Sequence, residues 1–228
     1  MIPYRDNLPV YRFPIVNYIL IIINIAVFIF QVWSGFAEAL FLEFAMIPSV
    51  FWRDPVSNWY RPFSSMFMHG GWGHIIGNML FLWIMGDNVE DVLGHFRYFL
   101  FYMVAGLIGT FVQASISFAS PVPMVGASAA ISGVIVLFFI FFPKVKVYFL
   151  LFFILPVGIP AFLFIFFWIL TQFLNGLGSL PYAVRGDGGG VAYLAHIGGI
   201  IYGFFYGLNR GRILKLKWME RIKRQKID

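Results

Sequence analysis

Apolar residues run through most of this chain in long stretches that charged residues do not interrupt. Four such stretches lie between Arg12 and Glu38, Arg97 and Lys144, Lys146 and Arg185, and Asp187 and Arg210. Each has at least the ~20 residues needed to cross about 30 Å of hydrocarbon. Because lipid offers no hydrogen-bond partner to an open backbone, segments that cross it must be helices. The pattern therefore predicts an all-α membrane protein.

Dividing these stretches at their Gly, Pro and polar residues predicts six transmembrane helices, the second of them short and Gly-rich. The predicted helices are Ile15–Val32, Gly73–Gly86, Tyr98–Phe118, Val122–Phe142, Ile159–Leu174 and Val191–Leu208. We expect residues 1–14 to form a cytoplasmic segment, residues 15–209 a six-helix domain and residues 210–228 a basic cytoplasmic tail. The apolar stretch Val147–Val157 is interrupted by a proline, and we expect it to lie at the membrane interface within a cytoplasmic loop.

Composition and charge support this organisation. Hydrophobic residues make up 61% of the chain and charged residues 11%, whereas a soluble domain carries about 25% charged residues. With both termini in the cytoplasm, thirteen of the sixteen Lys and Arg residues lie inside and three lie outside. Because the cytoplasmic loops of membrane proteins carry an excess of Lys and Arg, this count predicts the orientation. The basic tail is explained by topology and attraction to anionic lipid, and we expect no nucleic-acid partner.

Three groups of polar residues lie at one depth in the predicted spans: His74 with Asn78, Ser128, and His196. The second, fourth and sixth helices run from outside to inside, which places these groups about 10 Å below the outer face. Polar side chains inside a membrane are costly, so each is a candidate functional residue. A serine, a histidine and additional hydrogen-bond donors are also the parts of an acyl-transfer site.

The helix faces bring these groups together. His74 and Asn78 are four residues apart and share one face of a helix. Small residues repeat every four positions below His196, at Gly199, Gly203 and Gly207, and a stripe of this kind lets another helix approach closely. We therefore expect Gly199 and Gly203 to pack against the fourth helix and to bring Ser128 within hydrogen-bonding reach of His196.

Each feature also has an explanation without catalysis. A serine in a membrane helix commonly donates to the carbonyl of the preceding turn. A lone histidine can be structural or part of a proton path, and a stripe of glycines indicates packing. Ser132, one turn after Ser128, is a rival nucleophile. We favour Ser128 because Pro123 and Gly126 place it just past a turn, near the positive end of the helix.

Three sequence segments together resemble the rhomboid family of intramembrane serine proteases. They are HIIGN in the second helix, GASAA at the head of the fourth and AHIGGIIYG in the sixth. The resemblance implies a six-helix rhomboid-like bundle with a Ser–His dyad that has no acidic third member. It implies Ser128 as nucleophile, His196 as general base, and His74 with Asn78 in the oxyanion hole. The implied substrates are single-span transmembrane proteins, cleaved near the outer membrane face.

Two further segments are similar to the family. WYRPFSSMFMH resembles its first external loop, with Arg61 at a characteristic arginine, and VEDVLG places Glu90 at a structural glutamate. We expect a multi-pass protein of the lipid bilayer, in a prokaryotic plasma (inner) membrane. The chain has no cysteine, and we expect neither a cofactor nor a metal.

The chain departs from the family pattern at two positions. Ala129 stands where the family usually has glycine, and its methyl group is expected to narrow the substrate cleft. Ser132 stands where some members carry an aromatic residue that stacks on the catalytic histidine, so the support for His196 must come from elsewhere. The Gly-rich segment Leu180–Gly190 is expected to be a mobile loop that caps the site.

Two other functional classes remain open. One is a non-catalytic rhomboid-like protein that binds membrane clients; such relatives lose the serine or the histidine, and this chain keeps both. The other is a small transporter, which the absence of Asp, Glu, Lys and Arg from the middle of the predicted spans argues against.

Overall fold

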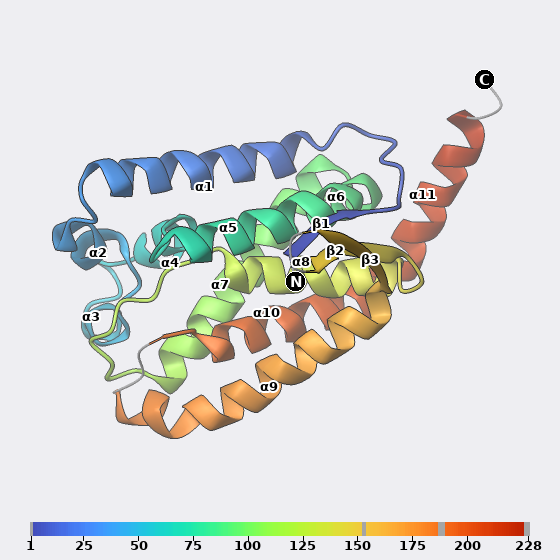
Figure 1. Cartoon of the computed structure of the whole chain (residues 1–228). Coiled ribbons are helices and arrows are strands. Elements are labelled where there is room, and N and C mark those ends of the chain that lie inside the picture. Colours follow the sequence, from blue (N-terminus) through green and yellow to red (C-terminus); the bar gives the residue numbers. More distant parts are fainter. Residues whose placement is uncertain (1, 152–153, 187–189, 226–228) are drawn as a thin grey trace.

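A computed structural model of the chain describes residues 2–151, 154–186 and 190–225, and it is a bundle of helices with one small sheet (Figure 1). Three of its helices are long and apolar enough to cross a membrane: α1 (Ile15–Trp33), α7 (His95–Ile116) and α9 (Ala161–Arg185). A fourth apolar helix, α8 (Ser128–Phe141), is shorter. The structure is mostly helical with apolar candidate spans, as predicted, but it is not all-α, because it also contains a small sheet.

Two other helices continue through a π-helical turn. The first runs from α5 (Trp72–Phe81) through η2 (Leu82–Gly86) into α6 (Asp87–Leu93), and the second from α10 (Tyr193–Tyr206) through η3 (Gly207–Gly211) into α11 (Arg212–Gln225). Between α1 and α5 the chain forms α2 (Glu38–Phe44), α3 (Pro48–Arg53), α4 (Arg61–Ser64) and the turn η1 (Ser65–Phe67). Figure 1 shows these short elements at one end of the bundle and the sheet at the other.

Helix α8 forms the centre of the bundle. Eleven of its 14 residues are buried, and the large side chains Tyr98, Phe101 and Tyr102 of α7 belong to the same core. The outer helices α1 and α9 instead expose apolar residues such as Ile22 and Phe166. Exposed apolar surface of this extent is typical of a face that meets lipid.

The fourth helix starts later than the sequence predicted. It begins at Ser128 rather than Val122, because residues 122–127 form an irregular, non-helical segment. Pro123 has no backbone N–H to continue a helix, and Gly126 has φ +127°, a conformation that residues with a side chain rarely adopt. Ser128 is therefore the first residue of its helix and not the seventh.

The fifth helix is longer than predicted. It was expected to end at Leu174, but α9 continues through Pro181 to Arg185 and ends at Gly186, whose φ is +80°. The expected loop Leu180–Gly190 is thus helical over its first six residues, and residues 187–189 lie outside the described part of the chain. Glycine in the left-handed conformation is a common helix terminator, which explains the end at this position.

The described residues of Val147–Val157, which was expected to be an interfacial loop, mostly form strands of a three-stranded antiparallel sheet, and residues 152–153 lie outside the described part of the chain. Its strands are β1 (Ile2–Asp6), β2 (Lys146–Leu151) and β3 (Leu155–Pro160), in the order β1-β2-β3. In the register, Asp6 lies opposite Val147 and Lys146 opposite Pro160. The prolines lie on the two edge strands, where the absence of a backbone N–H is tolerated because one side of the strand has no neighbouring strand to bond. The sheet is held to the bundle by Phe149, whose ring centroid lies 4.7 Å from that of Phe164 on α9.

Glu90 of α6 caps the start of α1. Its two carboxylate oxygens accept hydrogen bonds from the backbone N–H groups of Val16 and Asn17, at 3.0 and 2.7 Å. Helix α1 has no capping side chain of its own at Pro14, and a carboxylate is favourable at the positive end of a helix. Glu90 therefore joins α1 to the end of the α5–α6 helix.

Two carboxyl groups, Asp6 and Asp87, meet beside the sheet, beyond the predicted span that ends at Gly86. The side-chain amide of Asn88 donates to both, at 2.8 Å each. Burial raises the pKa of Asp6 to about 6, and burial with the nearby charge of Asp6 raises the pKa of Asp87 to about 7. Both values exceed the ordinary Asp pKa of ~3.9, so the folded state binds extra protons between about pH 4 and 7. The free energy of unfolding therefore falls as the pH rises through this window.

We expect Asp87→Asn to raise the midpoint of thermal unfolding at pH 8 by about 2–8 °C, corresponding to roughly 1–2 kcal/mol after screening at this half-buried site. Near pH 4, where the wild-type groups are protonated in the folded state, the variant should change little. Thermal unfolding in detergent at the two pH values measures the difference. The matched control is Asp54→Asn, because hydrogen bonds from Ser57 lower the pKa of Asp54. If the unfolding midpoint at pH 8 rose equally in both variants, the gain would come from the change in net charge, and the destabilising role of the buried Asp87 carboxylate would be contradicted.

Candidate functional site

The candidate residues converge because three helices begin at the same end of the bundle. Helices α5, α8 and α10 run in the same direction, with their first residues toward the short helices α2 and α3 (Figure 1). His74 is the third residue of α5, Ser128 the first of α8 and His196 the fourth of α10. All three therefore lie in the first turn of a helix, where free backbone N–H groups and the helix dipole favour negative charge.

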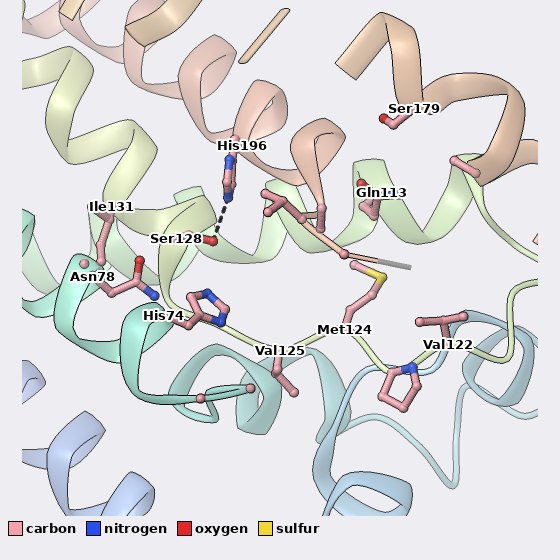
Figure 2. Close-up of a pocket in the computed structure, with 18 of the residues that line it drawn as sticks. His74, Asn78, Gln113, Val122, Met124, Val125, Ser128, Ile131, Ser179 and His196 are labelled. Carbon is pink, nitrogen blue, oxygen red and sulfur yellow. Dashed lines mark hydrogen bonds between the residues drawn. The ribbon is translucent and has the colours of Figure 1, made fainter. Parts of the chain in front are cut away.

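Ser128 and His196 are in direct contact. The Oγ of Ser128 lies 2.8 Å from the Nε2 of His196, and Figure 2 shows this hydrogen bond at the side of a cavity. The contact depends on close packing of α8 and α10 through glycine. A Cβ at Gly199 would lie 2.0 Å from the carbonyl oxygen of Ala129, and one at Gly203 would lie 2.8 Å from that of Gly133. Larger residues at these positions would force the two helices apart.

The segment before α8 fixes the position of Ser128. The backbone N–H of Gly126 donates to the carbonyl of Ser65 at 2.9 Å, and Met124 forms an isolated antiparallel bridge with Met46. A Cβ at Gly126 would come within 2.7 Å of the His74 ring. Glycine is therefore required here both for its backbone conformation and for the approach of His74.

Ser132, the rival nucleophile, has a different environment. Its Oγ donates to the carbonyl of Ser128 at 2.7 Å, which is the common arrangement for a serine inside a helix, and the residue is 1% exposed. The described cavity is lined by Ser128 and not by Ser132. Ala129 does not line this cavity either, since its Cβ faces Gly109 of α7. The expected narrowing of the cleft by the Ala129 methyl group is therefore not found.

His74 and Asn78 of α5 lie on the side of Ser128 opposite His196 (Figure 2). The side-chain amide of Asn78 lies 2.9 Å from the Nε2 of His69, a residue to which the sequence analysis gave no role. The backbone of His69 is held by Gln31 of α1, which accepts from its N–H at 3.0 Å and donates to its carbonyl at 3.1 Å. One amide hydrogen of Asn78 is thus engaged by His69, and the other is free to donate elsewhere.

The second nitrogen of His196 also has a partner that the sequence analysis missed. Its Nδ1 lies 2.8 Å from the Oε1 of Gln172, a buried residue of α9. Ser132 offers no aromatic ring to hold His196, and Gln172 on the neighbouring helix α9 holds its imidazole instead. Gln172 carried no sequence signal, because its partner depends on the rotation of α9 against α10.

Arg61 holds the loop that leads into the site. Its guanidinium donates to the backbone carbonyls of Leu42 at 2.6 Å and Ala45 at 3.1 Å, and to the side chain of Asn58. These bonds join α2 to α4 across the loop. Because buried carbonyl groups need partners, Arg61 stabilises the fold of this loop and does not reach Ser128.

The cavity beside the Ser128–His196 pair has a volume of about 1010 Å³. It extends from α5 past α8 to α9 and is lined by His74, Asn78, Trp168 and Tyr182 together with the pair. A cavity of this size holds several residues of an extended peptide. Within the described ranges, no group of three or more His, Cys, Asp or Glu residues is arranged to hold a metal ion.

Comparison with known proteins gives matches along most of the chain. The model of the rhomboid domain family matches residues 56–213. Rhomboid protein 1, mitochondrial, of Saccharomyces cerevisiae is 30% identical over 196 residues, which is 83% of this chain and 51% of that relative. Rhomboid protease GluP of Bacillus subtilis is 41% identical over 75 residues, 33% of this chain and 14% of the relative. The chain thus spans about half, or less, of the length of these relatives.

Proposed function

The chain belongs to the rhomboid family, and from this premise we propose that it is an intramembrane serine endopeptidase. The family match and the long apolar helices identify it as an integral membrane protein. The observation that carries the proposal is the hydrogen bond of 2.8 Å between Ser128 Oγ and His196 Nε2 beside a large cavity. A serine hydroxyl is a weak nucleophile until a neighbouring base accepts its proton, and this contact supplies that base.

In the proposed reaction, Ser128 Oγ attacks the carbonyl carbon of a peptide bond while its proton passes to His196 Nε2. The resulting tetrahedral intermediate collapses, the C–N bond breaks, and His196 donates the proton to the leaving amine. Water then attacks the acyl-enzyme with the same histidine as base, which releases the carboxylate product and restores Ser128. Both half-reactions use one proton carrier, so no other titratable group is needed.

We propose that three hydrogen-bond donors stabilise the oxyanion of this intermediate. We assign the free amide hydrogen of Asn78, the ring of His74 and the backbone N–H of Ser128 to this role. Ser128 N–H belongs to the first turn of α8, where no helical carbonyl accepts it. Donors that are fixed before the reaction cost no reorganisation in the transition state, and such sites contribute a large share of catalysis.

We further propose six membrane spans, formed by α1, α5 with η2, α7, α8, α9, and α10 with η3, with both termini in the cytoplasm. The 14 residues of α8 extend about 21 Å, which is shorter than the hydrocarbon thickness. This length is acceptable because neighbouring helices cover α8, so its ends meet protein and not lipid. The site then lies near the outer face of a plasma membrane.

The proposed substrates are single-span transmembrane proteins, which enter between α5 and α9. Phe81 of α5 and Phe164 of α9 stack with their centroids 6.0 Å apart, and Trp168, one turn after Phe164, lines the cavity. These apolar contacts between two helices can separate in lipid at little cost, because a substrate helix or lipid replaces them.

The test uses the purified chain in liposomes with a labelled single-span substrate. We expect cleavage of the substrate into two products and covalent labelling of the chain by a fluorophosphonate. A non-catalytic client-binding protein would retain the substrate on affinity purification, with neither products nor label. That outcome would replace the protease proposal with the alternative.

A further inference from the structure

The hydrogen bonds around Gln172 fix the direction in which its amide points. Thr171 Oγ1 donates to the carbonyl of Trp168 at 2.7 Å, so its lone pairs face the amide nitrogen of Gln172 at 3.2 Å. The same nitrogen donates to the Trp168 carbonyl at 3.3 Å. A carbonyl oxygen only accepts, so the nitrogen of the Gln172 amide must lie on this side. Its Oε1 is then the atom that faces His196.

This direction determines the protonation of the imidazole. Gln172 Oε1 can only accept, so the Nδ1 of His196 must carry a hydrogen and donate it across the 2.8 Å contact. A neutral imidazole with its hydrogen on Nδ1 has a free lone pair on Nε2. That lone pair faces Ser128 Oγ at 2.8 Å, and the serine hydroxyl donates to it. The opposite tautomer would donate to Ser128 and leave it without a base.

We infer that Gln172 is a positioning residue that selects the base-competent tautomer of His196 and fixes its ring, so that the site works as a Ser–His–Gln triad. The inference rests on the proposed function. It differs from the Ser–His dyad that the family resemblance implies, because a third side chain on α9 now orients the base. An amide suits this position, since a buried carboxylate would need a charged partner within the bundle.

The first variant is Gln172→Met, which keeps the length of the side chain and removes the acceptor. We expect kcat for substrate cleavage to fall by about 10–100-fold. This fall in kcat is larger than the loss of one neutral hydrogen bond would cause. It is smaller than the roughly 10⁴-fold fall in kcat when a soluble serine protease loses the aspartate that orients its histidine. KM should change less than threefold, because Gln172 is not among the residues that line the cavity. The matched control is Asn175→Met, which removes an exposed amide one turn further along α9.

Two readouts separate positioning from simple packing. Gln172→Glu should restore kcat to within about fivefold of wild type, because a neutral glutamic acid accepts from His196 Nδ1 and donates to the Trp168 carbonyl. The ¹⁵N spectrum of the His196 ring, identified by its absence in His196→Ala, reports the tautomer directly. We expect the Nδ1–H form in the wild type and a mixture with the Nε2–H form in Gln172→Met.

The proposal is overturned if Gln172→Met retains full kcat, if Gln172→Glu is as slow as Gln172→Met, or if the wild-type ring is in the Nε2–H form. It is also overturned if Asn175→Met loses as much activity, since the effect would then belong to α9 as a whole. The ring spectrum requires no substrate. A chain that cleaves nothing but shows the expected tautomers would therefore contradict the proposed function and leave the role of Gln172 standing.

Discussion

Replacing Ser128 with alanine should lower kcat by about 10⁶-fold, the size of loss found when a serine protease loses its nucleophile. The expected loss is this large because the described cavity offers no second hydroxyl in contact with His196. The fold should survive, since the Ser128 side chain is half-buried and bonds only to His196. Cleavage of a labelled single-span substrate in liposomes, with the thermal unfolding midpoint in detergent, measures both effects.

The matched control is Ser132→Ala, one turn along the same helix. It removes a hydroxyl that donates to the Ser128 carbonyl, and the carbonyl keeps its place in the helix. We expect activity within about tenfold of wild type, since a bond of this kind contributes roughly 0.5–1.5 kcal/mol. Loss of activity in Ser132→Ala together with a competent Ser128→Ala would make Ser132 the nucleophile.

Asn78→Ala should lower kcat by roughly 10²–10³-fold, or ~2.7–4 kcal/mol, the usual cost of removing one oxyanion donor. KM should change little, because this hydrogen bond is made only in the transition state. The contact with His69 gives Asn78 a second, structural role. Without Asn78 the buried Nε2 of His69 loses its partner, which costs about 1–3 kcal/mol of stability.

His69→Ala separates the two roles of Asn78. The variant removes the buried ring but leaves the Asn78 amide in place. We therefore expect kcat to fall only about tenfold, and the unfolding midpoint to fall at least as far as it does in Asn78→Ala. The comparison of kcat with unfolding midpoint across the two variants decides the assignment. If Asn78→Ala has near-normal kcat and is destabilised like His69→Ala, Asn78 is a structural residue and His74 with the backbone holds the oxyanion.

The sequence was sufficient to predict that the main residues of the candidate site lie close together, but not to predict which side chains support them. His74, Asn78, Ser128 and His196 could be related because helix periodicity and the small residues near Gly199 restrict how helices pack. Gln172 could not be found in this way, because a single glutamine in an apolar helix has no periodic signal. Its partner depends on the rotation of one helix against another, which only the packed structure determines.

The errors in the fold have similar causes. The start of α8 was placed six residues early because residues 122–127 are mostly apolar, although Pro123 and Gly126 interrupt a helix there. The sheet was missed because its pairing is not local: Ile2 lies opposite Leu150, far along the chain. Hydropathy describes segments one at a time and contains no information on which distant segments pair.

That long separation has a consequence for how the molecule is made. Strand β1 leaves the ribosome before any of the helices, but β2 follows about 140 residues later. At about 5–20 residues per second, the edge of β1 waits roughly 7–28 s for its partner, while the helices before β2 are synthesised. Closing the sheet therefore waits until four of the six proposed spans have been made, and it joins β1 to the segment that leads into α9.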